Sequence, residues 1–182
     1  MTNAPNPKYR LQGLMLASFL FIADQAVKFI MIGPLALQSR RQIHIISFFD
    51  LTWAENRGVS MGFLEANSEA QRWLLVALTA LIAGIVAVWM WREKLRGDVL
   101  ALAMVLGGAL GNIVDRVRYG YVVDYADLHF GNFRPFWIFN LADACITIGV
   151  LILLARAFLI RDKADNKEPT VHPASSGDGI AE

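Results

Sequence analysis

Charged residues and cysteine are both scarce in this sequence. Asp, Glu, Lys and Arg make up only 18% of the 182 residues, against about 25% in typical soluble domains. The net charge of +1 lacks the basic excess of nucleic-acid-binding proteins, so we expect no nucleic-acid partner. The single cysteine, Cys145, excludes an intrachain disulfide and a multi-cysteine zinc site. Because 55% of the residues are hydrophobic, the chain also lacks the composition of a disordered protein.

The apolar residues are gathered into long runs. Residues 73–91 and 99–114 contain no charged side chain, and two further runs contain only three between them. About 20 apolar residues in a helix cross the 30 Å hydrocarbon core of a bilayer. A soluble protein of this size has no room to bury four such helices. The sequence therefore predicts an all-α polytopic membrane protein with four transmembrane helices, at about 11–32, 69–91, 98–116 and 137–159.

Basic residues predict the orientation of these helices. They are dense before the first helix, between the second and third, and after the fourth, as in Arg92, Lys94 and Arg96. The positive-inside rule then places both termini in the cytoplasm. The first helix is too long and too charged for a cleaved signal peptide, so we expect it to be retained. Residues 163–182 are expected to form a disordered cytoplasmic tail.

One segment outside the helices changes period. Between residues 41 and 53, apolar side chains such as Ile43, Ile45 and Leu51 alternate with polar ones. A period of two is typical of a β-strand. We therefore expect a β-rich outer segment at about 35–66, forming a small extracytoplasmic sheet that lies on the membrane surface.

Ionisable residues inside the membrane are candidates for function because burying them costs several kcal/mol, roughly 2.5–3.5 on insertion scales. Asp24 and Lys28 are four residues apart, so they share a helix face and can pair. We interpret them mainly as a structural pair, with contact to a substrate as the alternative. Asp115 and Arg116 end the third helix, where they are either functional or a simple interfacial charge pair. Asn112 lies one turn deeper and needs hydrogen-bond partners.

Two further aspartates, Asp124 and Asp143, flank a short connection near the outer surface. Two carboxyl groups a few Å apart do not both ionise easily, so they share a proton. The ionised member then activates water, and the protonated member donates to a carbonyl or a leaving amine. Spacing alone leaves a second interpretation open, since isolated aspartates at helix ends are usually caps.

Other chemistries lack their residues. His44, His129 and His172 show no zinc-binding spacing. The serines include no GxSxG turn, and the sequence has no phosphate-binding glycine loop. We therefore expect no metal and no cofactor.

The polar motifs together resemble those of bacterial lipoprotein signal peptidase, the signal peptidase II family of aspartyl proteases. The resemblance covers residues 11–158 and keeps the motifs in the family's order. They are DQAVK (24–28), ENRGVSMGF (55–63), GNIVDR (111–116), VVDYAD (122–127) and FNLADACITIG (139–149).

This resemblance implies a single membrane-embedded peptidase domain, residues 1–162, in the bacterial inner membrane with its active site near the periplasmic face. It implies cleavage of diacylglyceryl-modified prolipoproteins before the lipidated cysteine, by a monomer in contact with membrane lipid. Globomycin-type inhibitors would occupy the site. The implied catalytic dyad is Asp124 and Asp143, and Asp24, Lys28 and Asp115 would be mainly architectural. Residues lining the substrate site would be Asn56, Gly58, Asn112, Arg116, Asn140 and Ala142.

Two alternatives from other classes stay open at this point. A metal-dependent membrane lipid phosphotransferase uses clustered aspartates, glycine and arginine at a membrane face, which residues 115–127 imitate in part. A non-enzymatic small transporter would account for the buried Asp24 and Lys28, but it predicts no carboxylate pair at one surface.

Overall fold

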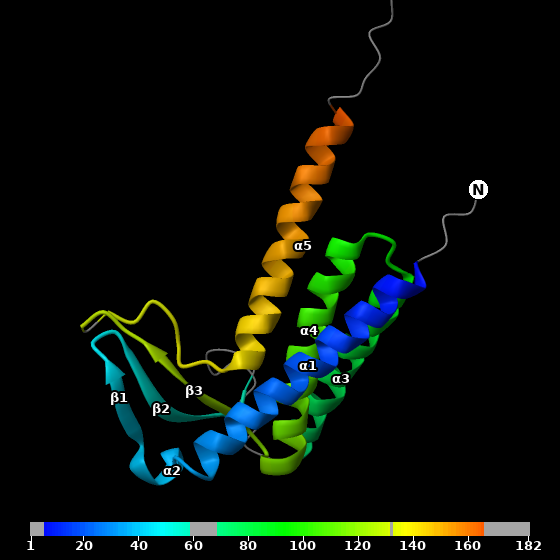
Figure 1. Cartoon of the computed structure of the whole chain (residues 1–182). Coiled ribbons are helices and arrows are strands. Elements are labelled where there is room, and N and C mark those ends of the chain that lie inside the picture. Colours follow the sequence, from blue (N-terminus) through cyan, green and yellow to red (C-terminus); the bar gives the residue numbers. More distant parts are fainter. Residues whose placement is uncertain (1–5, 59–68, 132, 166–182) are drawn as a thin grey trace, which may run out of the picture.

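Four long helices and a small sheet make up the computed structural model of the chain, which describes residues 6–58, 69–131 and 133–165 (Figure 1). The helices are α1 (Pro7–Ile32), α3 (Glu69–Arg92), α4 (Arg96–Tyr119) and α5 (Leu141–Asp165). Each contains a stretch long and apolar enough to cross a membrane. The prediction of four transmembrane helices is therefore confirmed, with ends that differ from the predicted ones by up to six residues.

Helix α4 is the centre of the bundle. Half of its most apolar stretch is buried, against 17–22% in the other three helices. Small residues allow this packing: a Cβ on Gly107 would lie 2.7 Å from the Ala17 carbonyl oxygen of α1, and one on Gly108 would collide with the Ala142 carbonyl of α5. The glycines of α4 therefore allow close approach of α1 and α5, as small residues do in membrane helices.

The sheet has three antiparallel strands in the order β1-β2-β3. Strands β1 (Gln42–Ile46) and β2 (Phe49–Asn56) form a hairpin, and β3 (Val122–Leu128) pairs with β2. A short helix, α2 (Leu37–Arg40), connects α1 to β1. The core between the sheet and α1 contains buried Leu37, Leu51, Trp53 and Val123.

Two details of the sheet differ from the sequence prediction. The alternating segment 41–53 is not one strand, because a turn at Ser47 and Phe48 divides it into β1 and the start of β2. Asp124, which was expected only beside a short connection near the outer surface, lies on β3, because residues 122–128 form a strand. Every residue from Val122 to Asp127 is buried, so this strand lacks the alternation that reveals a half-exposed one.

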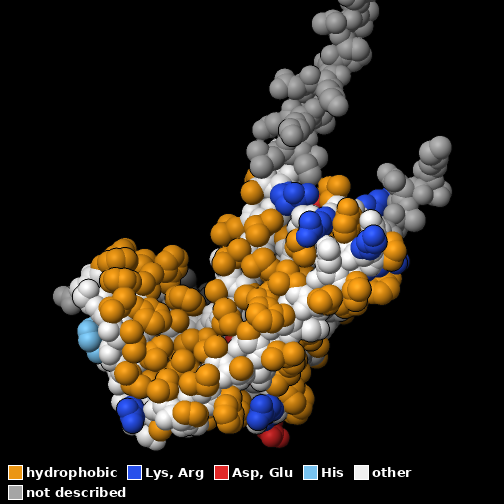
Figure 2. All heavy atoms as spheres, viewed as in Figure 1, with side chains coloured by type: hydrophobic (Ala, Val, Ile, Leu, Met, Phe, Trp, Pro, Cys, Tyr) orange, Lys and Arg blue, Asp and Glu red, His pale blue; other side chains and the backbone are white. Residues whose placement is uncertain are grey.

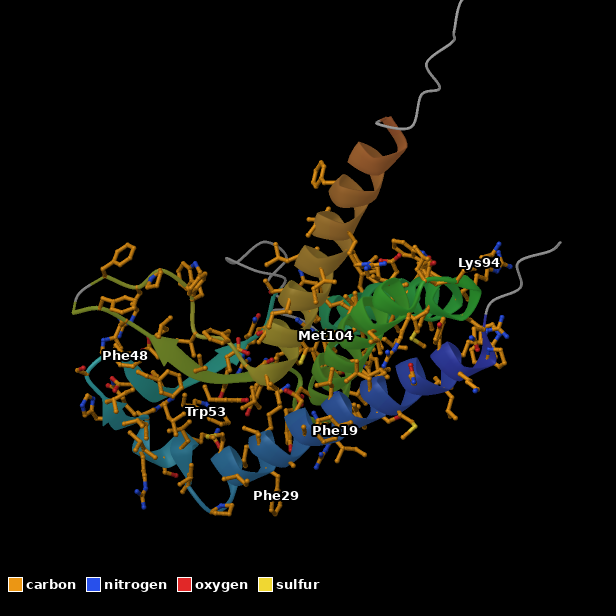
Figure 3. The ribbon with its side chains drawn as sticks, turned by 45° about the horizontal axis from the view of Figure 1, so that its top comes forward. Phe19, Phe29, Phe48, Trp53, Lys94 and Met104 are labelled. Atoms are coloured by element: carbon orange, nitrogen blue, oxygen red, sulfur yellow. The ribbon has the colours of Figure 1, made fainter. Side chains whose placement is uncertain are left out.

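The two ends of the bundle differ in charge. The start of α1, the connection between α3 and α4, and the far end of α5 all lie at the end opposite the sheet (Figure 1). Figure 2 shows more Lys and Arg side chains at this end than at the opposite one, and apolar side chains along the helices. In Figure 3, Lys94 lies at the end opposite Phe48 and the sheet. The large apolar side chains of Phe19 and Phe29 are exposed on α1.

The C-terminal boundary falls later than expected. Helix α5 continues to Asp165, so the first three residues of the expected tail belong to it. Residues 166–182 of that tail lie outside the described residues, as do residues 59–63 of the motif that begins at Glu55.

Candidate active site

Asp143 is held in the first turn of α5 by a reciprocal cap. Its backbone N–H donates to Asn140 Oδ1 (2.8 Å), and Asn140 N–H donates to Asp143 Oδ2 (3.3 Å). This is the geometry of a capping box, in which two otherwise unpaired backbone donors are satisfied. The other oxygen, Oδ1, accepts from Asn112 Nδ2 on α4 (2.7 Å). The alternative interpretation of Asp143 as a helix cap is therefore correct for its Oδ2. Its Oδ1 takes no part in the cap and contacts Asn112 instead.

Asp124, which belongs to strand β3 of the sheet, contacts the same asparagine as Asp143. Its partner on β2 is Ala54, beside a register shift between Leu51 and Ala54. The side chain is buried, and its Oδ1 accepts from Asn140 Nδ2 (2.6 Å). Asn140 therefore contacts both aspartates, one through its side-chain amide and the other through the cap. The structure brings together the two carboxyl groups that the sequence paired.

Burial and the nearby charge of Asp143 both raise the pKa of Asp124, against hydrogen bonds from Asn56 and Asn140 that lower it, and the result is a pKa of about 7. A carboxyl group in this range can hold a proton near neutral pH and release it. Asp143 also accepts hydrogen bonds from two donors, Asn112 and the Asn140 backbone. Because the charge of Asp143 raises the pKa of Asp124, the two carboxyl groups do not ionise together easily, as an acid and base pair requires.

A buried ionic cluster lies behind the pair. Lys28 Nζ contacts Asp24 Oδ2 (2.8 Å) and Asp115 Oδ2 (2.7 Å). It also donates to Asn112 Oδ1 (3.1 Å). The predicted pairing of Asp24 with Lys28 is confirmed. The proposed interfacial pair of Asp115 with Arg116 is not formed, because Asp115 pairs with Lys28.

This cluster also connects to the backbone around both aspartates. Asp24 Oδ1 accepts from Ala142 N–H (3.1 Å), one residue before Asp143. Asp115 Oδ2 accepts from Val123 N–H (3.2 Å), one residue before Asp124. The ionic cluster therefore anchors both elements that carry the dyad.

The remaining predicted residues, Asn56, Gly58 and Arg116, are connected by hydrogen bonds. Arg116 is buried and donates to the Gly58 carbonyl (3.0 Å), while Gly58 N–H donates to Asn56 Oδ1 (3.2 Å). Arg116 Nε is buried and has no hydrogen-bond partner within the described parts of the chain. A buried guanidinium with a free donor beside two carboxyl groups is suited to bind a substrate carbonyl.

Sequence reasoning missed two residues that support the site. The hydroxyl of Tyr125 accepts from Leu141 N–H (3.1 Å) at the start of α5, and burial raises the pKa of this tyrosine. Gln25 donates to Asp24, to Asp115 and to the Gly111 carbonyl. Both lie inside the motifs that carried the resemblance, beside Asp124 and Asp24, which is the signal that would have found them.

The described residues include no group of three or more His, Cys, Asp or Glu side chains placed to hold one metal ion.

Four membrane-spanning helices, with the carboxyl groups of Asp124 on β3 and Asp143 on α5 close together at one end of the bundle, define a polytopic membrane protein. The sequence comparison is more specific. The model of the signal peptidase (SPase) II family matches residues 16–159. The chain belongs to this peptidase family.

Relatives and solved structures agree with this assignment. The lipoprotein signal peptidase of Sphingopyxis alaskensis is 57% identical over 164 residues, covering 90% of this chain and 94% of that protein. The lipoprotein signal peptidase of Rhizorhabdus wittichii is 54% identical, covering 94% and 96%. A bacterial membrane enzyme solved by the in meso method at 2.3 Å has a TM-score of 0.74 at 26% identity, covering 94% of this chain and 99% of its own.

Proposed function

We propose that the chain is an intramembrane aspartyl endopeptidase that removes signal peptides from diacylglyceryl-modified prolipoproteins, cleaving before the lipidated cysteine. Membership of the signal peptidase II family carries the peptidase activity and the lipoprotein substrate class. The observation that carries the aspartyl mechanism is the contact of one asparagine, Asn140, with both Asp124 and Asp143.

The environments of the two carboxyl groups suggest their roles. Asp124, with its pKa near 7, holds the shared proton at rest, and Asp143 is ionised. Asp143 takes a proton from water as the water oxygen adds to the scissile carbonyl carbon. Asp124 gives its proton to the carbonyl oxygen, so the intermediate is a neutral gem-diol.

Collapse of the gem-diol reverses these roles. Asp143 passes its proton to the leaving nitrogen, Asp124 recovers a proton from a gem-diol hydroxyl, and the C–N bond breaks. Arg116, with its free Nε, is placed to orient a carbonyl of the substrate. Asn56, Gly58, Asn112, Asn140 and Ala142 would complete the lining, and Asp24, Lys28 and Asp115 would hold it in shape.

Exposed aromatic side chains at one end of the sheet support the proposal that the sheet lies at the membrane surface. Phe48 stacks on Phe130, with ring centroids 6.3 Å apart, and both rings are exposed at the end of the sheet away from α1. Phe133, Phe136 and Trp137 are exposed in the connection to α5. Exposed aromatic side chains are enriched at membrane interfaces. We infer that this end of the sheet lies against the outer leaflet, where acyl chains would hold the lipidated cysteine.

The charge distribution supports an N-in/C-in orientation, with the bundle end bearing Arg92, Lys94 and Arg96 in the cytoplasm of the bacterial inner membrane. The dyad would then lie near the periplasmic face. We expect a monomer that contacts membrane lipid, and inhibition by globomycin-type peptides that occupy the same site.

A cleavage assay tests the proposal. Purified protein should cleave a diacylglyceryl-modified proprotein in EDTA, and Asp124→Asn and Asp143→Asn should each abolish cleavage while the protein stays folded. Asp127→Asn is the matched control, because Asp127 is a buried carboxylate on the same strand but bonds to Arg134 and Thr52. Normal turnover in either dyad variant would refute the mechanism. Loss of wild-type activity in EDTA would instead favour a metal-dependent enzyme.

A further inference from the structure

Lys28 has a third partner that charge neutralisation does not require. Its ammonium group lies between the carboxylates of Asp24 and Asp115, which already outnumber it in charge. An ammonium group has three N–H donors, and the third goes to Asn112 Oδ1 at 3.1 Å. Lys28 is almost completely buried, so water does not compete for this donor.

This contact determines which way the Asn112 amide points. The two ends of an amide differ, because oxygen only accepts hydrogen bonds and NH2 only donates them. Two donors, Lys28 Nζ and Asn140 Nδ2, meet at Asn112 Oδ1. A flipped amide would place its NH2 against these two donors and its oxygen against the Asp143 carboxylate. The flipped orientation is therefore unfavourable on both sides, and the charged Lys28 is one of the two donors that oppose it at the oxygen.

The orientation matters for Asp143. With the amide held as it is, Asn112 Nδ2 donates to Asp143 Oδ1 at 2.7 Å. The other carboxylate oxygen is held by the cap at Asn140. Donors on both oxygens stabilise the ionised carboxylate and fix its direction. A path of two hydrogen bonds thus runs from the buried lysine on α1, through α4, to the carboxylate on α5.

We propose that Lys28 is a positioning residue for the peptidase reaction, which locks the Asn112 amide so that it donates to the catalytic base Asp143. This inference rests on the proposed function. It gives Lys28 a task beyond the architectural one implied by the family resemblance.

A pair of variants separates positioning from architecture. Lys28→Gln and Lys28→Met both remove the buried charge at similar side-chain length, but only glutamine keeps an N–H donor for Asn112. We expect both to lower thermal stability by similar amounts. We expect kcat to fall roughly a hundredfold in Lys28→Met, as misplacement of a catalytic group does. In Lys28→Gln the fold loss of kcat should be at least ten times smaller. KM should change little in either variant.

The pH profile is a readout that architecture alone would not move. In Lys28→Met, Asp143 loses its fixed donor, so the acidic limb of kcat against pH should move to higher pH, while in Lys28→Gln it should move less. The matched control is Arg156→Met. Arg156 pairs with Asp98 at the end of the bundle opposite the site, so this variant should lose stability and keep the wild-type kcat and profile. Equal kcat losses and equal profiles in the two Lys28 variants would overturn the proposal.

A second substitution leaves Lys28 in place and tests the same path if the Lys28 variants do not fold. Asn112→Asp keeps an acceptor oxygen for the Lys28 ammonium group but turns a second oxygen, in place of the NH2 group, toward Asp143. Turnover should fall at neutral pH and recover in acid, where the introduced carboxyl can donate. A wild-type kcat and pH profile would overturn the proposal. Failure of the proposed function gives a different result, namely wild-type protein that does not cleave or an active Asp143→Asn variant.

Discussion

The ionisation of Asp124 offers a test of the site that needs no substrate. Burial raises the pKa of this carboxyl group from its ordinary 3.8 to about 7. A shift of that size corresponds to about 4 kcal/mol, at about 1.36 kcal/mol per pKa unit. Because the folded pKa is raised, the folded state retains a proton that the unfolded chain releases. The contribution is therefore favourable at low pH and is lost as the pH rises through 7.

The size of the expected change in the free energy of unfolding follows from the linkage between proton binding and folding. Between pH 5 and pH 8, a group with these two pKa values lowers the free energy of unfolding by about 3 kcal/mol. The substitution Asp124→Asn removes the titrating group while keeping a side chain of the same shape. The stability of this variant relative to the wild type should therefore increase by about 3 kcal/mol between pH 5 and pH 8.

The assay is thermal or denaturant unfolding in detergent across this pH range, with Asp50→Asn as the control. Asp50 lies on the same sheet. Burial acts to raise its pKa, but hydrogen bonds from His44, Gln42 and His129 outweigh this and leave the pKa lowered. Its stabilising contribution is present above the ordinary value and is lost toward acid. Asp50→Asn should therefore be less stable than wild type at pH 8, whereas Asp124→Asn should gain stability relative to wild type as the pH rises to that value. A stability difference for Asp124→Asn that is the same at pH 5 and pH 8 would refute the reasoning.

Three further outcomes are expected. The alkaline limb of kcat/KM should fall through about pH 7, since the general acid Asp124 of the free enzyme loses its proton there; a kcat/KM that stays flat to pH 9 would contradict this assignment. Gly108→Ala should reduce turnover roughly a hundredfold, because the added methyl collides with the Ala142 carbonyl beside Asp143, whereas Gly84→Ala meets nothing within 4 Å and should match wild type. With phenylalanine at the other tryptophan positions, Trp137 fluorescence should be quenched by brominated lipid; quenching only by aqueous iodide would place the exposed aromatic end in water.

The sequence by itself determined the four membrane helices, because about 20 apolar residues in a row have few other stable environments. It also determined the pairing of Asp24 with Lys28, since residues four apart share a helix face. The single cysteine excluded a disulfide framework within the chain, and the net charge of +1 gave no indication of nucleic-acid binding. The order of the polar motifs indicated the peptidase family, which the comparison then confirmed.

Only the tertiary structure decided how the dyad is held. Residues 122–127 are all buried, so they carry no alternation, and β3 becomes visible only through its pairing with β2. Lys28 and Asp115 are 87 positions apart in the sequence. Nothing local in either segment predicts that Asp115 pairs with Lys28 rather than with its neighbour Arg116. Asn140 contacts both aspartates because a helix cap and a strand meet there. Periodicity reports the surroundings of one segment at a time, whereas these contacts depend on which segments the fold brings together.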